Sequence, residues 1–74
     1  MSTLLTPDGQ PNWEQTGKEA WKLDLGEGLL TMEYYEKLKV AKLWRNGRFM
    51  KRFRGDDCVE QLNMNVLRQI KRLS

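Results

Sequence analysis

Apolar and charged residues first alternate in this chain with the period of a β-strand. In EAWKLDL, residues 19–25, every second side chain from the tryptophan onward is apolar, as in a strand with one buried face. GEG at 26–28 follows, a short glycine-containing loop that favours a hairpin, and LLTMEYYE is the returning segment. We therefore expect strands over about 19–25 and 29–36.

Residues 31–45 carry signals for both kinds of secondary structure. Apolar side chains recur there at helical spacing, which favours a helix. The tyrosines, valine and tryptophan of the same stretch favour a pleated strand, and Asn46-Gly47 between two apolar-rich runs is a strong hairpin signal. We favour strands over about 38–45 and 48–54, because RFMKRFR needs a neighbouring strand with which to pair.

A two-residue turn at Asn46-Gly47 would fix which side chains of this hairpin share a face of the sheet. Regular pairing away from the turn predicts two sets. One face carries Val40, Lys42, Trp44, Phe49, Lys51 and Phe53. The opposite face carries Ala41, Leu43 and Met50, ringed by Arg45, Arg48 and Arg52. A longer loop with a bulge would shift the register and mix these two sets.

The C-terminal segment has the clearest pattern and predicts an amphipathic helix over about 57–73. Five apolar side chains step by three or four residues along one helical face, namely Val59, Leu62, Val66, Ile70 and Leu73. Asp57 followed by Glu60 resembles a capping box at the start of the helix. Basic residues near its end suit the negative pole of the helix dipole.

The first 17 residues differ in composition from the rest. MSTLLTPDGQPNWEQTG holds both prolines and shows no sustained periodicity, which favours a flexible N-terminal arm over 1–17. Trp13 is expected to dock on the rest of the chain, because its large apolar surface is costly to leave in water. The whole pattern predicts one small α+β domain over 18–74, in which an antiparallel sheet of three or four strands packs against the C-terminal helix.

The composition argues against an enzyme. The chain has 74 residues, no histidine and a single cysteine, Cys58, so the commonest proton shuttle and an internal disulfide are both excluded. We expect no catalytic or metal site, no cofactor and no small-molecule substrate, with Cys58 filling the core. No stretch approaches the roughly 20 apolar residues that span a bilayer, and a signal-peptide pattern is missing, so we expect a cytoplasmic protein without membrane contact.

The charge is distributed unevenly along the chain. Residues 1–35 hold two lysines against six acidic residues, whereas residues 36–74 hold eleven basic residues against four acidic ones. KLWRNGRFMKRFRG at 42–55 combines six basic side chains with three aromatic ones and has no carboxylate. Cations that meet phosphates and rings that stack on bases are typical of nucleic-acid binding. The expected contact residues are Lys42, Trp44, Arg45, Arg48, Phe49, Lys51, Arg52 and Arg54.

Two other interpretations of the basic segment stay open. In the first, its three aromatic side chains form the core of the small domain, and its cations form a solvated outer face. Alternatively, the basic surface binds an acidic protein surface, as in a bacteriophage-type inhibitor or adaptor of a host enzyme such as RNA polymerase. That second hypothesis adds Leu4, Leu5 and Trp13 as further partner contacts. The pattern fits a monomer or a homodimer equally well.

One local resemblance concerns VAKLWRNGR, residues 40–48, which looks like the opening strand and turn of AbrB-type antitoxins. Proteins of that family bind operator DNA as swapped-hairpin dimers, so the resemblance implies DNA binding. It covers nine of 74 residues, and the continuation FMKRFRG departs from the small polar and apolar pattern of the family. It does not place the chain in that family.

Overall fold

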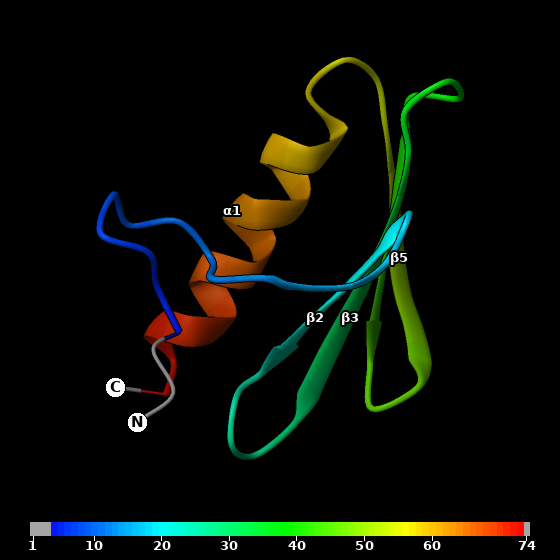
Figure 1. Ribbon diagram of the computed structural model, residues 1–74. Coiled ribbons are helices and arrows are strands. Elements are labelled where there is room, and N and C mark those ends of the chain that lie inside the picture. The colour runs from blue at the N-terminus through cyan, green and yellow to red at the C-terminus, as the bar shows by residue number, and fades with distance from the viewer. Residues whose placement is uncertain (1–3, 74) are drawn as a thin grey trace.

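The computed structural model describes residues 4–73, which form a five-stranded antiparallel sheet and one helix (Figure 1). The strands are β1 (Glu14–Gly17), β2 (Ala20–Asp24), β3 (Leu29–Tyr35), β4 (Val40–Arg45) and β5 (Arg48–Arg54), and the helix is α1 (Cys58–Lys71). The strands lie side by side in chain order. The α+β class, the C-terminal helix and the strand interpretation of residues 31–45 are therefore confirmed.

The number of strands corrects the sequence-based expectation of three or four. The fifth strand, β1, comes from the segment expected to be an arm, and Glu14 and Gln15 pair with Lys22 and Trp21 of β2. All four residues of β1 are exposed, so this polar edge strand leaves no hydrophobic alternation in the sequence. Residues 1–3 of the expected arm lie outside the described residues.

Trp13 is one of the contacts that hold the N-terminal segment on the domain. Its ring packs against the core, and its indole Nε1 donates a hydrogen bond of 2.9 Å to Oδ1 of Asn63 in α1. The bond satisfies the polar end of a side chain whose apolar body is partly buried. The docking expected for Trp13 is therefore confirmed, and Figure 1 shows the N-terminal segment (blue) running beside α1.

The core lies between α1 and one face of the sheet, here called the helix face (Figure 1). It is formed by alternate residues of the strands and by one stripe of the helix, as the two periodicities require. Its buried residues are Leu23, Leu25, Leu30, Met32, Ala41, Leu43, Phe53, Cys58, Leu62, Val66 and Ile70. Cys58 is only 1% exposed, so its role as a core residue is confirmed.

The start of α1 differs from the expected capping box. The side chain of Asp57 makes no capping hydrogen bond, and its Oδ1 instead accepts one of 2.8 Å from Nε2 of Gln61. The reason lies in the backbone, because φ of −103° and ψ of 19° at Asp57 are outside the extended region that a capping residue normally adopts. The backbone N–H of Cys58 is satisfied by the carbonyl of Gly55.

An ion pair joins the β3–β4 turn to the segment before α1. Nζ of Lys39 lies 2.9 Å from Oδ1 of Asp56, and the backbone N–H of Gly55 donates to the carbonyl of Lys39. The hydrogen bond and the charge of Lys39 lower the pKa of Asp56 below its ordinary value of 3.8. The same two effects of Asp56 raise the pKa of Lys39 above 10.5.

The first prediction concerns the pH dependence of this ion pair. Asp56 has a lowered pKa in the folded state, so its contribution is present above pH 3.8 and is lost as the pH falls through the folded pKa. Lys39 has a raised pKa, so its contribution is present below pH 10.5 and is lost as the pH rises through the folded pKa. We expect Asp56→Asn to lower the melting temperature slightly at neutral pH, and to lower it less at both extremes.

Thermal melts of both proteins from acid to alkaline pH measure this difference. Glu14→Gln is the control, because Glu14 is also exposed but pairs with Lys22 at 3.5 Å on another part of the surface. A difference for Asp56→Asn that stays constant across the whole pH range would show that the ion pair contributes nothing.

Candidate nucleic-acid interface

The β4–β5 hairpin turns at Asn46-Gly47, as the sequence predicts. Both residues have positive φ, 52° and 80°, which a type I′ turn requires and which glycine adopts without steric cost. The backbone N–H of Asn46 donates to the carbonyl of Leu29, and its Oδ1 accepts from the N–H of Leu29 at 2.9 Å. The tip of the hairpin is thus anchored to the start of β3.

A β-bulge in β5 changes the register beyond the turn. Trp44 still pairs with Phe49 as predicted, but Leu43 pairs with Lys51, so Met50 is the extra residue. From Lys51 onward, each side chain of β5 points to the other face of the sheet from the one expected. Phe53 therefore lies opposite Ala41 in the core and is 5% exposed, instead of opposite Val40.

The bulge has a clear energetic cause. Without it, Arg52 would lie opposite Ala41 and bury a guanidinium in the core, and Phe53 would be left on the other face. With it, an aromatic ring of large apolar area enters the core and the charge stays in water. The predicted sharing of a face by Lys51, Phe53 and Trp44 is therefore wrong, and so is the placement of Arg52 beside Leu43.

The sheet surface opposite the helix face is here called the open face, since no element within residues 4–73 covers it (Figure 1). Its residues follow from the strand register. They are Glu14 of β1, Ala20, Lys22 and Asp24 of β2, Leu29, Thr31, Glu33 and Tyr35 of β3, Val40, Lys42 and Trp44 of β4, and Phe49, Arg52 and Arg54 of β5. Rings and cations from separate strands thus meet on one surface.

Two aromatic contacts organise this surface. The Trp44 and Phe49 rings meet edge to face, with centroids 5.7 Å apart and an interplanar angle of 74°. Phe49 is 56% exposed, although burial of such a ring is the usual outcome. The ammonium of Lys42 lies 5.7 Å from the centroid of the Tyr35 ring, within cation–π range. The open face therefore presents aromatic surface beside cationic groups.

One carboxylate of the open face, that of Glu33 in β3, lies directly opposite a cation of the hairpin, Lys42. The hydroxyl of Tyr35 donates to its Oε1 at 2.6 Å. That hydrogen bond, followed by partial desolvation and by the charges of Glu33 and Glu19, raises the pKa of Tyr35 above 10.0. Tyr35 therefore stays protonated at neutral pH and holds the Glu33 carboxylate in place.

The eight residues predicted from the basic segment divide between the two faces. Five lie on the open face: Lys42, Trp44, Phe49, Arg52 and Arg54. The other three belong to the helix side of the hairpin: Arg45, Arg48 and Lys51. Arg45 is engaged internally, because its Nη1 donates to Gln69 at 2.8 Å and its Nη2 meets Glu27 at 3.3 Å.

Residues of β3 were missed by the sequence analysis. Thr31, Glu33 and Tyr35 alternate along that strand, and they join the basic hairpin only because β3 pairs with β4. The alternation of these residues along the strand was the available signal, but alternation does not predict which strands are neighbours in the sheet.

The N-terminal residues proposed as partner contacts differ in how closely they pack on the domain. Leu4 and Trp13 pack against the core, and Leu5 is 36% exposed. They do not form a joint exposed patch, because two of the three side chains are engaged by the protein's own domain.

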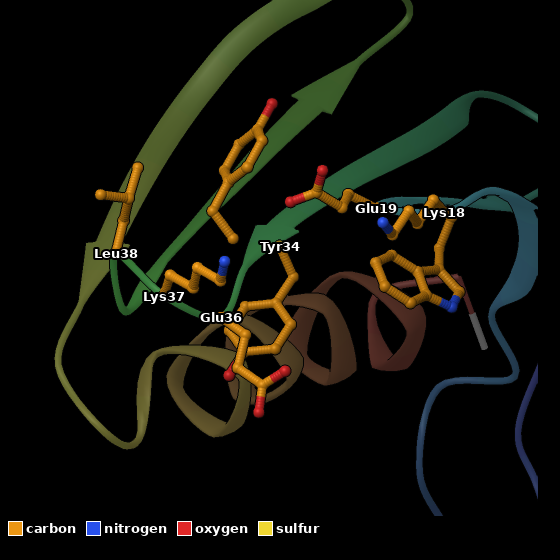
Figure 2. Close-up of a pocket in the computed structure, with 8 residues that line it drawn as sticks. Lys18, Glu19, Tyr34, Glu36, Lys37 and Leu38 are labelled. Atoms are coloured by element: carbon orange, nitrogen blue, oxygen red, sulfur yellow. The ribbon is translucent and has the colours of Figure 1, made fainter.

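A hollow separate from the basic hairpin lies at the end of the sheet where the β1–β2 and β3–β4 turns meet. Figure 2 shows its labelled lining residues, which are Lys18, Glu19, Tyr34, Glu36, Lys37 and Leu38. Its two lysines and two glutamates balance, so the hollow does not favour a ligand of either charge.

Two further observations concern metal binding and membrane crossing. Among residues 4–73, no three His, Cys, Asp or Glu side chains are grouped so as to hold a metal ion. The helix in this part of the chain is neither long nor apolar enough to cross a membrane.

Comparison of the chain with protein-family models, with curated proteins and with solved structures finds no match.

The second prediction tests the bulge through deletion of Met50. Removing the extra residue leaves Lys51 opposite Leu43 and keeps Phe53 in the core, so both faces retain their side chains. Met50 is 44% exposed and contributes little burial. We expect the variant to fold with a loss of about 1 kcal/mol in the free energy of unfolding, measured by urea denaturation.

Deletion of Lys42 from the regular strand β4 is the matched control. It turns Leu43, which is fully buried, toward the opposite face, and we expect an unfolded chain. If the Met50 deletion unfolds the chain as the Lys42 deletion does, the register described here is wrong.

Proposed function

We propose that this protein is a small non-enzymatic regulator that binds single-stranded nucleic acid through its open face. The observation that carries the proposal is the contact of the half-buried Trp44 ring with the exposed Phe49 ring beside Lys42, Arg52 and Arg54 on an uncovered sheet. Unstacked bases pack on such rings, with a gain of about 1–3 kcal/mol per base, and the cations neutralise phosphates.

The shape of the open face favours a single strand over a duplex. Five strands at a spacing of about 4.8 Å give a surface roughly 19 Å across. The major groove of B-DNA is about 12 Å wide and admits a helix or a two-stranded ribbon, so this sheet does not enter it face-on. A flexible single strand, in contrast, lays its bases on a flat surface.

The alternative is a protein-binding inhibitor or adaptor of a host enzyme such as RNA polymerase. Of its proposed arm contacts, Leu4 and Trp13 are packed on the core, which leaves that hypothesis with fewer exposed contacts than the open face offers. Removal of residues 1–17 is no clean test of it, because that change also removes β1 and the Trp13–Asn63 hydrogen bond.

The third prediction compares two double variants with the same loss of charge from the same strand. Arg52→Gln with Arg54→Gln removes two cations from the open face, whereas Arg48→Gln with Lys51→Gln removes two from the helix side. We expect the first pair to weaken binding of a labelled single-stranded oligonucleotide about tenfold at low salt. It should also reduce the slope of log affinity against log salt by about 1.4.

Fluorescence anisotropy with DNA and RNA strands at several salt concentrations measures both quantities. The helix-side pair should retain most of the affinity, and Trp44→Leu should lose about tenfold with little change in salt slope, since stacking carries no charge. Equal losses of affinity from the two double variants would show that binding depends only on the net charge of the protein. An absence of binding at low salt would remove the proposal.

A further inference from the structure

Phosphate binding does not explain the position of the Glu33 carboxylate on the open face. A carboxylate directly opposite Lys42 of the basic hairpin repels phosphates and weakens general binding. Lys42 is its cross-strand partner, yet the Lys42 ammonium lies over the Tyr35 ring, and no ion pair joins it to Glu33. The Glu33 carboxylate instead accepts a hydrogen bond at Oε1 from the Tyr35 hydroxyl.

Glu33 borders a depression on the open face beside Trp44. The depression has a volume of about 440 Å³, and its lining includes Thr16, Ala20, Thr31, Glu33 and Trp44. The register explains the hollow, because the small Ala20 lies opposite Glu33 on one side while Trp44 lies opposite Thr31 on the other. A flat ring, a polar hydroxyl and an oriented carboxylate therefore surround one space.

The chemistry of this group of residues favours one base. An ionised carboxylate only accepts hydrogen bonds, and it has two oxygens with which to do so. The Watson–Crick edge of guanine presents two adjacent N–H donors, whereas thymine and uracil place a carbonyl oxygen on each side of one N–H. Cytosine and adenine place an acceptor nitrogen next to their amino group. A carboxylate therefore pairs best with guanine.

We infer that this depression is a base-binding subsite, in which a guanine stacks on Trp44 and donates from its Watson–Crick edge to the Glu33 carboxylate. This inference rests on the proposed binding of single strands and adds base selectivity to it. Tyr35 acts as a positioning residue, because its hydroxyl fixes the Glu33 carboxylate. Thr31 offers a hydroxyl that both donates and accepts at the edge of the same space.

The test uses oligothymidine strands of about 12 nucleotides, within the site sizes of small single-strand-binding folds, with one central residue changed to G, A or C. Parallel RNA strands are based on uridine. We expect the strand with guanine to bind about tenfold more tightly than the unchanged one, as for a bidentate base contact. Glu33→Gln should reduce that ratio to about twofold or less, because an amide offers one acceptor and one donor.

Glu14→Gln is the matched control, since it removes the same charge from β1, where Glu14 pairs with Lys22 of the open face. It should preserve the guanine preference. Thermal melts confirm that both variants are folded.

Three outcomes would overturn the inference. If the wild-type protein binds all four strands equally, the subsite does not select guanine, and the proposed function stands. If Glu33→Gln strengthens binding to every strand by the same factor and keeps the preference, the carboxylate acts only through repulsion. If no strand binds at low salt, the proposed function fails together with the inference.

Discussion

The extra residue in β5 is the constraint on which the rest of this structure depends. Because Met50 bulges out of the ladder, Phe53 enters the core opposite Ala41 and Arg52 remains in water beside Lys42. A regular strand would reverse both side chains, at the expense of a buried charge and an exposed ring. The same local irregularity thus completes the hydrophobic core and concentrates cations on the open face.

The two sides of the hairpin use their cations differently. On the helix side, Arg45 bridges to Gln69 of α1 and to Glu27 of the β2–β3 loop, and Lys51 lies over the Phe53 ring at 5.2 Å. On the open face, Arg52 and Arg54 are exposed, and the cations lie among aromatic rings. The first set serves the fold, and the second is the basis of the proposed binding of single strands.

Much of the fold was predictable because its signals are local. The Asn46-Gly47 turn, the helix stripe and the alternation in β2 each follow from neighbouring residues and a fixed period. The edge strand β1 was not predictable, since its side chains are all exposed and its pairing with β2 leaves no apolar pattern. For the candidate site, the sequence identified the basic and aromatic residues but assigned several to the wrong face.

The sequence by itself determined the residue types available for recognition, the helix, the hairpin turn and the absence of histidine. Only the tertiary structure decided the bulge, the joining of Glu33 and Tyr35 to the hairpin, and the docking of Trp13 on Asn63. The physical reason is that periodicity and turn chemistry act over a few residues. Register and burial, by contrast, are settled by competition between whole side chains for one core.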